Sequence, residues 1–373
     1  MILRCVFLII CVAASISLHA KDSWDAVERI VAIGDIHGDY GQMLNVLKMT
    51  GVIDSKRRWV GGATHLVQTG DIPDRGPDTA KIIRFLMKLE KQARRRGGYV
   101  HLLVGNHEAM NVMGDLRYVH PGEYSALRTP KSRQLRDAYY EASLEWMNKN
   151  IAEEDLPVLD EAHRQQWETR YPLGYVEHRR IWSPQGEFGR WITKHNTVIR
   201  INDILFVHGG LGPAYSQQEL SELNDAVDTA LVQPRTQESI LESDDSPLWY
   251  RGLANNAEEF ERPHLEHLLE RFAVNHIVMA HTVTEGAIKP RFDGRVILID
   301  VGMSAYYGSH MAALIVEHGK FSVEHRGVHM PLPFSGDALI SYLERAMALE
   351  TQKAALQALI EKLQQKNGAV PVP

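Results

Sequence analysis

The run Arg-Ile-Val-Ala-Ile-Gly-Asp-Ile-His-Gly at residues 29–38 joins an apolar, strand-like stretch to a short loop that carries two metal-binding side chains. Asp35 and His37 are two residues apart, so an extended backbone places both on one side. The same design recurs as His-Leu-Val-Gln-Thr-Gly-Asp-Ile-Pro-Asp-Arg-Gly at residues 65–76 and Tyr-Val-His-Leu-Leu-Val-Gly-Asn-His-Glu at residues 99–108. Because a rigid sheet fixes where such loops converge, the pattern predicts one metal site at the ends of several strands.

Apolar runs predict where the strands of this sheet lie, at residues 29–33, 65–69, 99–104, 204–207, 276–280 and 295–299. Their near-continuous Ile, Val and Leu content is typical of strands that are covered on both faces. Helical patterns at residues 40–50 and 77–96 lie between the early strands, and a glycine follows each of them. The alternation of strand, ligand loop and helix predicts an α/β fold.

Two further regions are predicted to be helical. About a hundred residues separate Asn106 from His208 without a ligand motif, which is longer than an ordinary connection. Helical patterns at residues 131–149 and 161–170 indicate a mostly helical insertion over about residues 112–200, which either shapes the substrate site or is a neutral surface elaboration.

Near the C-terminus, residues 337–366 are predicted to form one long helix with a short apolar stripe. The stripe consists of Leu356, Leu359, Ile360 and Leu363. We expect it to dock on its own domain rather than to form a dimer, because it is short for a coiled coil.

The composition is that of a globular protein, with 44% hydrophobic and 24% charged residues. The net charge of −6, from 41 basic and 47 acidic residues, argues against bulk nucleic-acid binding, which usually needs a basic surface. It does not exclude a small anionic substrate, because a local metal cluster can dominate the field where an anion binds.

The N-terminus has the order of a secretory signal peptide: Arg4, an apolar run at residues 6–14, and Ser-Leu-His-Ala at residues 17–20. We expect cleavage after Ala20; the alternative is an uncleaved anchor, but the run is shorter than the ~20 residues that span a bilayer. Both cysteines, Cys5 and Cys11, lie in this segment, so the mature chain would have none and a net charge of −7, from 40 basic and 47 acidic residues.

We therefore expect an exported protein, periplasmic in a Gram-negative bacterium, that has no disulfides and no stable membrane insertion after cleavage. The predicted organisation is a signal peptide at residues 1–20, a main domain at 21–330 that contains the metal-binding motifs, and a C-terminal amphipathic helix and tail at 331–373. The oligomeric state is left open by the sequence.

The second and third motifs and two later strands complete the predicted set of metal ligands. Asp71 can bridge two ions with its two oxygens, and Asn106 offers a neutral oxygen. His208, in Phe-Val-His-Gly-Gly at residues 206–210, and His281, in Met-Ala-His-Thr at residues 279–282, offer nitrogens. With Asp35 and His37, three nitrogens and three oxygens suit Mn²⁺ first, with Fe or Zn²⁺ as alternatives, better than Ca²⁺.

In this order the motifs resemble those of the calcineurin-like metallophosphoesterases. Asp-Arg-Gly at residues 74–76 and Val-His-Gly-Gly-Leu at residues 207–211 resemble the phosphoprotein phosphatase branch. The exported start, the insertion and Pro-Leu-Trp-Tyr-Arg-Gly at residues 247–252 are most similar to the Shewanella-like protein phosphatases. The resemblance implies a metallophosphoesterase sandwich of two mixed sheets flanked by helices.

The resemblance also implies a two-metal mechanism. One ion would be held by Asp35, His37 and Asp71, and the other by Asp71, Asn106, His208 and His281. Ions roughly 3.5–4 Å apart can share a hydroxide that attacks phosphorus directly, so no phosphoenzyme is expected. His107 would then donate a proton to the departing oxygen, while Asp74 orients its ring.

Arg75 and Arg251 are the candidate phosphate clamps, together with Asn106, because a guanidinium gives two hydrogen bonds and stays charged. A salt bridge within the loop is the alternative for each arginine. Tyr306 would line the mouth of the site, although packing against its neighbours is an equal alternative. The stretch Ser-Ala-Tyr-Tyr-Gly at residues 304–308 departs from the Ser-Ala-Pro-Asn-Tyr-Cys of eukaryotic-type members, so their preferences are not carried over.

The sequence therefore predicts an exported dinuclear metal-dependent phosphomonoesterase, most simply a protein phosphatase acting on phosphotyrosine or on phosphoserine and phosphothreonine. A phosphatase or pyrophosphatase for nucleotides or other small phosphates would use the same metal ligands. A binding module that kept the fold without catalysis is disfavoured, because every predicted ligand is present together with His107 and Asp74.

Overall fold

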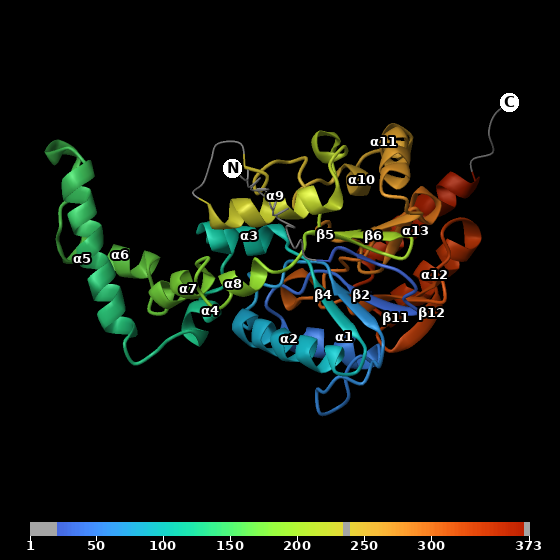
Figure 1. The fold of residues 1–373 in the computed structure, drawn as a ribbon, viewed down its shortest axis with the longest axis horizontal. Coiled ribbons are helices and arrows are strands. Elements are labelled where there is room, and N and C mark those ends of the chain that lie inside the picture. The colour runs from blue at the N-terminus through green and yellow to red at the C-terminus, as the bar shows by residue number, and fades with distance from the viewer. Residues whose placement is uncertain (1–20, 234–238, 369–373) are drawn as a thin grey trace, which may run out of the picture.

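The computed structural model describes residues 21–233 and 239–368. The predicted signal peptide at residues 1–20, with both cysteines, lies outside the described residues, as does the end of the tail. Among the residues described, no helix combines the length and the apolar character needed to cross a membrane. Two six-stranded sheets stack face to face between layers of helices (Figure 1).

The first sheet has the order β12-β11-β10-β2-β3-β4. Its strands β2, β3 and β4 are parallel, and β10, β11 and β12 extend the sheet antiparallel from the other side of β2. The strands are β2 (Arg29–Ile33), β3 (His65–Gln68), β4 (Tyr99–Leu102), β10 (Ala312–Glu317), β11 (Lys320–His325) and β12 (Val328–Pro331).

The second sheet has the order β1-β5-β6-β7-β9-β8 and is also mixed. Its central strands β6, β7 and β9 run parallel, so their carboxyl ends lie at one edge of the sheet. The strands are β1 (Ser23–Trp24), β5 (Val198–Ile201), β6 (Ile204–Val207), β7 (His276–Met279), β8 (Lys289–Arg291) and β9 (Val296–Leu298).

The alternation of side chains along each strand builds two faces of core. On β2, Val31 and Ile33 pack in a cluster with α1 (Tyr40–Met49) and α2 (Thr79–Arg94), whereas Ile30 and Ala32 pack in the cluster shared by the two sheets. A third cluster joins the second sheet to α11 (Glu258–Arg271). The order of layers is therefore helix, sheet, sheet, helix, which confirms the predicted sandwich.

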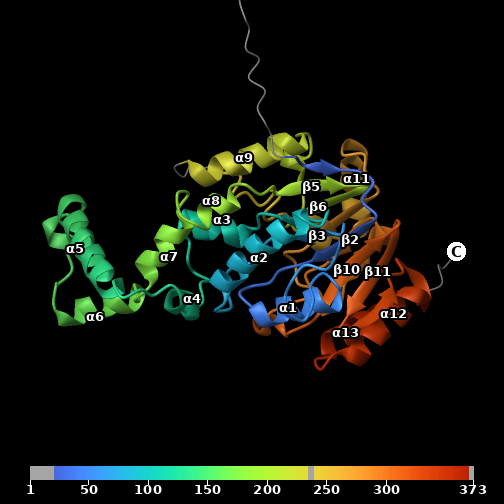
Figure 2. The ribbon, with the colours of Figure 1, turned by 60° about the horizontal axis from the view of Figure 1, so that its bottom comes forward.

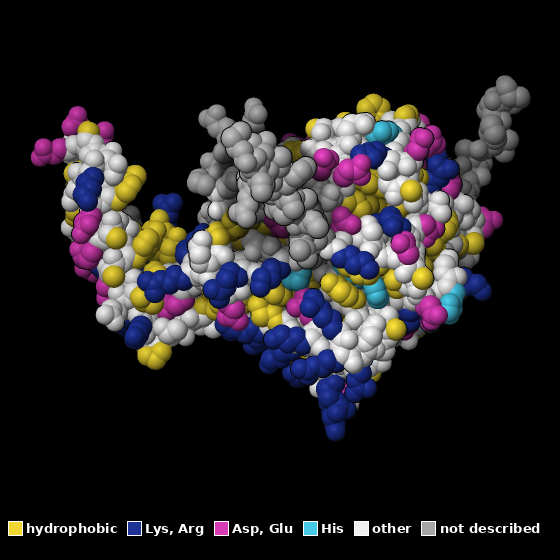
Figure 3. Space-filling view, viewed as in Figure 1, with side chains coloured by type: hydrophobic (Ala, Val, Ile, Leu, Met, Phe, Trp, Pro, Cys, Tyr) yellow, Lys and Arg dark blue, Asp and Glu magenta, His cyan; other side chains and the backbone are white. Residues whose placement is uncertain are grey.

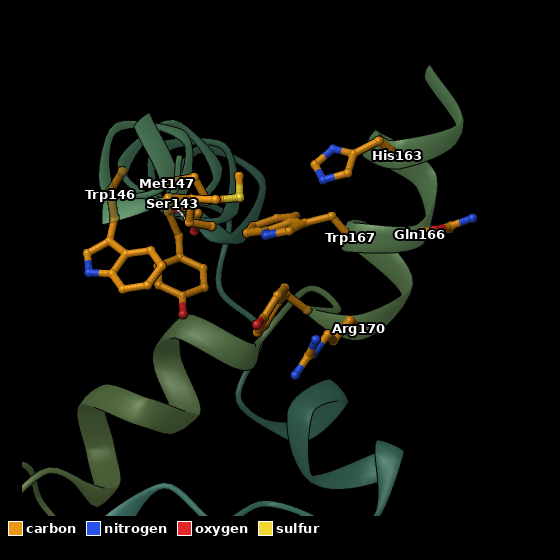
Figure 4. Close-up of a pocket in the computed structure, with 11 residues that line it drawn as sticks. Ser143, Trp146, Met147, His163, Gln166, Trp167 and Arg170 are labelled. Carbon is orange, nitrogen blue, oxygen red and sulfur yellow. Dashed lines mark hydrogen bonds between the residues drawn. The ribbon is translucent and has the colours of Figure 1, made fainter. Parts of the chain in front are cut away.

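Residues 103–197 are all described and form helices and turns without a strand. The helices are α3 (Asn106–Met113), α4 (Pro121–Ala126), α5 (Ser132–Asn150), α6 (Glu161–Arg170), α7 (Tyr175–Trp182) and α8 (Gly189–Ile192). Helices α5 and α6 project from the body as an arm, α7 links this arm to the body, and α3 and α8 lie against the body (Figures 1 and 2). A cavity of about 760 Å³ lies between α5 and α6, where Trp167 and His163 reach toward Met147 (Figure 4). Acidic side chains gather along the outer edge of this arm (Figure 3).

The remaining helical elements lie between those already described. They are the helices α9 (Leu220–Val232) and α10 (Gly252–Asn255) and the single 3₁₀ turns at Glu153–Asp155, Pro213–Tyr215, Phe292–Gly294 and Ala305–Tyr307.

The prediction of one long C-terminal helix is wrong, because the chain forms α12 (Gly336–Leu349) and α13 (Ala354–Gly368). Glu350 leaves the first helix with an extended backbone, and its buried carboxylate accepts hydrogen bonds from Arg326 and His325. This tertiary anchor interrupts a sequence with good helix propensity. The apolar stripe nevertheless docks on its own domain, because Leu356 and Ile360 are buried in the core between the sheets.

Candidate metal centre and active site

Each predicted metal ligand lies beyond the carboxyl end of a strand in the parallel part of its sheet. Asp35 and His37 follow β2, Asp71 follows β3 and Asn106 follows β4; His208 follows β6 and His281 follows β7. All six side chains are buried. The two sheets therefore bring residues that are up to 246 positions apart in sequence into one site.

Backbone hydrogen bonds lock the first two loops together. The amides of Ile36 and His37 both donate to the carbonyl oxygen of Asp71 at 3.0 Å. Gly70, in the loop after β3, packs closely against Gly105 in the loop after β4. Its φ is 99°, and a Cβ there would lie 2.7 Å from the amide nitrogen of Gly105. A side chain at this position would both be strained and push the loops apart.

The backbone of the site is itself unusual. Five predicted site residues are among the fourteen described non-glycine residues with positive φ: His37, Asp71, Asp74, Arg75 and His281. Such conformations cost roughly 1–3 kcal/mol each and persist only where surrounding contacts hold them. Because five of them lie at this site, the surrounding fold must stabilise the backbone conformations that direct these side chains toward one another.

Two groups of three ligand atoms lie close enough to share an ion. One group is His37, Asp71 and His107, and the other is Asp71, His208 and His281, each with its atoms within 4.8 Å of one another. Asp71 belongs to both, which suits a bridging ligand. Asp35 is adjacent, with Oδ2 at 3.7 Å from Nε2 of His37.

The histidines are oriented by bonds on the far side of their rings. Nδ1 of His208 donates to the carbonyl oxygen of Thr69 at 2.8 Å, so Nε2 points inward, 3.3 Å from Oδ1 of Asp71 and 2.9 Å from Oδ1 of Asn106. Nδ1 of His37 likewise bonds the carbonyl oxygen of Pro73 at 3.1 Å. A carbonyl on one ring nitrogen leaves the other nitrogen as the unprotonated ligand of a cation.

The site contains several buried carboxylates close together, which a bound cation would stabilise. Burial, together with the neighbouring carboxylates of Asp300 and Asp71, raises the pKa of Asp35 well above its ordinary value. Burial also raises the pKa of Asp300, at the end of β9, to about 6. Three crowded, buried carboxylates and inward-facing imidazoles are a donor set that divalent cations satisfy, so the residues present fit two metal ions.

His107 and Asp74 form a buried pair beside these ligands. Nδ1 of His107 lies 2.5 Å from Oδ2 of Asp74, while Asn111 donates to Oδ1 of the same carboxylate at 3.0 Å. Burial alone lowers the pKa of His107, but the carboxylates of Asp71 and Asp74 outweigh it and raise the pKa to about 9. These two carboxylates therefore favour the protonated form of the ring.

Glu108 has a role that the sequence reasoning did not assign, although it lies in the third motif. Its carboxylate is fully buried and accepts the backbone amides of Asp71, Ile72 and Gly105 at 2.7–2.9 Å. These bonds tie the second loop to the third. The sequence did contain an indication of this role. Glu108 lies within a motif predicted to be buried, and a buried glutamate is almost always paired with hydrogen-bond donors or a cation.

Arg75 lies between two aromatic rings. Its guanidinium carbon is 4.0 Å from the ring centre of Tyr118 and 4.8 Å from that of Tyr306, and Nη1 donates to the hydroxyl of Tyr306 at 3.2 Å. The alternative of a salt bridge within the loop is not found for Arg75 among the described residues, and its Nε has no hydrogen-bond partner there. Tyr118 was missed, because it lies in a loop without a motif.

Arg251 lies on the side of the second ligand group. Its Nη1 donates to the carbonyl oxygen of His281 at 2.8 Å and to the hydroxyl of Thr282 at 3.0 Å. The guanidinium is thereby fixed next to His281 through backbone rather than through a carboxylate. Arg251 and Arg75 thus border the ligands from different loops.

The comparisons with known proteins agree with this geometry. The calcineurin-like phosphoesterase family model matches residues 28–285, which include every predicted metal ligand. An uncharacterised protein of Schizosaccharomyces pombe is 33% identical over 308 residues, covering 80% of this chain and 79% of the relative. Shewanella-like protein phosphatase 2 of Arabidopsis thaliana is 32% identical over 294 residues, covering 74% and 72%.

A solved structure is also similar. The crystal structure of a cold-active protein-tyrosine phosphatase of a psychrophile, Shewanella sp., matches with a TM-score of 0.64 and 29% identity, covering 83% of this chain and 82% of that one. The chain therefore belongs to the calcineurin-like phosphoesterase family and is a metal-dependent phosphatase.

Proposed function

We propose that this phosphatase contains two metal ions and removes phosphate from tyrosine side chains of proteins. The observation that carries the proposal is the position of Arg75, which is held between the rings of Tyr118 and Tyr306 beside the His107–Asp74 pair. Arg75 offers a fixed cation for the phosphate, and the rings offer an apolar wall for the aromatic part of the substrate. The name of the similar Shewanella structure, a protein-tyrosine phosphatase, supports the same class.

The proposed ligands are those predicted from the sequence, with Mn²⁺ as the proposed metal and Fe or Zn²⁺ as alternatives. When bound, two such ions would neutralise phosphate charge and make a water molecule a stronger nucleophile. Asp71 lies in both ligand groups and is the proposed bridge. Arg75 and Arg251 would bind the phosphate oxygens, with the amide of Asn106 as a further donor.

His107 is the proposed proton donor to the departing oxygen. Its Nδ1 is occupied by Asp74, so Nε2 is the nitrogen that faces the ligand cluster, 3.8 Å from Oδ2 of Asp71. A raised pKa keeps the proton on the ring at neutral pH, and Asp74 keeps the ring aimed.

The aromatic rings at the mouth favour an aryl substrate over an alkyl one. Tyr306 is 60% exposed, so its ring is available to a ligand, and Tyr307 stands next to His37 at 5.2 Å. A phosphotyrosine ring can contact this wall while its phosphate reaches Arg75 and the metal ligands. Phosphoserine lacks the apolar area that such a wall would cover.

The test compares matched phosphopeptides that contain phosphotyrosine, phosphoserine or phosphothreonine in one sequence, on protein of known metal content. We expect kcat/KM to be highest for phosphotyrosine. Activity on p-nitrophenyl phosphate should be lost in Asp71→Asn and retained in Asp293→Asn, a change at an exposed carboxylate. Faster turnover of dinucleoside polyphosphates than of any peptide would favour the small-phosphate alternative instead.

We also propose that the protein is exported. Support comes from the N-terminal order of Arg4, an apolar run and Ala20, and from the absence of cysteine after residue 20. N-terminal sequencing of the protein recovered from the producing cell should begin at Lys21. Recovery of the intact N-terminus from the cytoplasm would contradict export.

A further inference from the structure

The dipeptide Asp74–Arg75 carries two proposed functions on a strained backbone. Its residues have φ values of 71° and 64°, in the left-handed region that side chains disfavour. Asp74 aims His107, and Arg75 is the proposed phosphate clamp. Something must therefore hold this backbone in place.

Both backbone amides of the dipeptide donate to the segment that follows α3. The amide of Asp74 donates to Oε1 of Glu123, in α4, at 3.0 Å, and the amide of Arg75 donates to the carbonyl oxygen of Tyr118 at 3.1 Å. Glu123 is almost fully buried, with 3% of its surface exposed. A buried carboxyl group at this place has a specific task, because burying it without one would be costly.

The same segment touches the functional side chains as well as the backbone. The ring of Tyr118 lies against the guanidinium of Arg75 and 5.2 Å from the ring of His107. Farther along, Arg179 of α7 donates to the carbonyl oxygens of Asn111 and Val112 at the end of α3, the helix that carries His107. The insertion thus contacts the backbone that carries Asp74 and the helix that carries His107.

We propose that Glu123 is a positioning residue for catalysis, which holds the Asp74–Arg75 backbone so that Asp74 aims the proton donor. This inference rests on the proposed role of the His107–Asp74 pair and assigns the first part of the insertion, residues 115–126, to the active site. The projecting arm of α5 and α6 makes none of these contacts. Protonated Glu123 also suits the role, because a second negative charge would repel Asp74; burial and Asp74 raise its pKa to about 8.

The experiment compares Glu123→Gln, which keeps an acceptor oxygen, with Glu123→Leu, which removes it, in the metal-loaded full chain. We expect Glu123→Gln to stay near wild type at pH 7. Glu123→Leu should lower kcat by about tenfold to a hundredfold, more for phenyl phosphate than for p-nitrophenyl phosphate, because the poorer leaving group needs the proton more. Its Mn²⁺ affinity should not change. If Glu123→Leu does not fold, Glu123→Met provides the same comparison.

A double-mutant cycle decides whether Glu123 acts through Asp74. In an Asp74→Asn background, Glu123→Leu should cause little further loss of kcat. Full additivity, or equal losses for both substrates, would overturn the proposal. Glu177→Leu is the matched control, because Glu177 lies in the same insertion but binds Ser132 instead of the dipeptide. If wild type had no metal-dependent phosphatase activity, the proposed function itself would fail, whereas normal activity in Glu123→Leu would refute only the positioning role.

Discussion

Nδ1 of His107 lies 2.5 Å from Oδ2 of Asp74, and both side chains are buried next to the predicted metal ligands. Asp74 comes from the loop after β3 and His107 from the first turn of α3. The pair therefore connects the motif at residues 65–76 with the motif at residues 99–108. Both side chains have a role in the proposed mechanism, but neither is a proposed metal ligand.

Asp74→Asn is expected to damage proton donation while leaving substrate binding nearly intact. The amide can keep the ring in place but removes one of the negative charges, those of Asp71 and Asp74, that raise the pKa of His107. We expect kcat on phenyl phosphate to fall about 10²-fold or more, KM to change little, and p-nitrophenyl phosphate to be affected less. Equal losses for the two substrates would show that Asp74 has a different task.

Tyr118 is expected to matter through its ring rather than its hydroxyl. Its ring centre is 4.0 Å from the Arg75 guanidinium, and no hydrogen bond of its hydroxyl is needed for that contact. A cation–π contact of about 0.5–2 kcal/mol predicts that Tyr118→Leu raises KM for phosphotyrosine peptide severalfold, whereas Tyr118→Phe leaves it unchanged. Steady-state kinetics with both variants measures this. A loss in Tyr118→Phe equal to that in Tyr118→Leu would refute the ring argument.

Much of the site was predictable because its side chains stand next to strand ends, where sequence and space coincide. The strands at residues 29–33 and 204–207 have the predicted bounds, and the others differ by one or two residues at an end. Glycine, aspartate, asparagine and histidine at these ends are local signals. The structure places all six predicted metal ligands together, and their assignment to two ions stays a prediction.

What the sequence did not reveal depends on contacts between distant segments. Six of the twelve described strands were not predicted: β1, β5, β8, β10, β11 and β12. Of these, β1, β8 and β12 lie at the edges of the two sheets, and β11 mixes charged and apolar residues. Glu350 breaks a helix only because His325 and Arg326 bind it from β11 and the turn after it. Tyr118 and Glu123 have no motif at all, since their roles come from the backbone of another loop.

Glu123 is expected to make stability depend on pH. Its pKa is near 4.5 in the unfolded chain and about 8 in the folded one, because of burial and the charge of Asp74. A raised folded pKa means that its contribution to stability is fully present below pH 4.5 and is lost as pH rises through 8. Glu123→Gln should remove this slope, so its free energy of unfolding should exceed that of wild type above pH 8. Urea denaturation of both proteins over this range, at constant metal, measures it; parallel slopes would contradict the assignment.

Glu350 is expected to be a strong contributor to stability. Its carboxylate lies 2.8 Å from Arg326 and 2.9 Å from both His310 and His325, with no exposed side-chain surface. Glu350→Ala leaves these groups without their anion, which predicts a loss of about 3–5 kcal/mol in the free energy of unfolding. Glu344→Ala, on the preceding helix, is the control and should cost little. Equal denaturation midpoints for the two variants would rule out this role of the cluster.

Metal binding is expected to stabilise the folded chain, because the crowded carboxylates of Asp35 and Asp71 lie within 4 Å of histidine nitrogens but of no lysine or arginine among the described residues. At free Mn²⁺ a hundred times its Kd, the free energy of unfolding should rise by about 2.7 kcal/mol over the metal-depleted protein. His208→Ala should reduce that gain, whereas His329→Ala, whose side chain is 61% exposed, should keep it. Thermal melts with and without chelator measure both. An Mn²⁺-dependent gain in His208→Ala as large as in wild type would place the ion elsewhere, and the ligand set derived from the six strand-end residues would have to be abandoned.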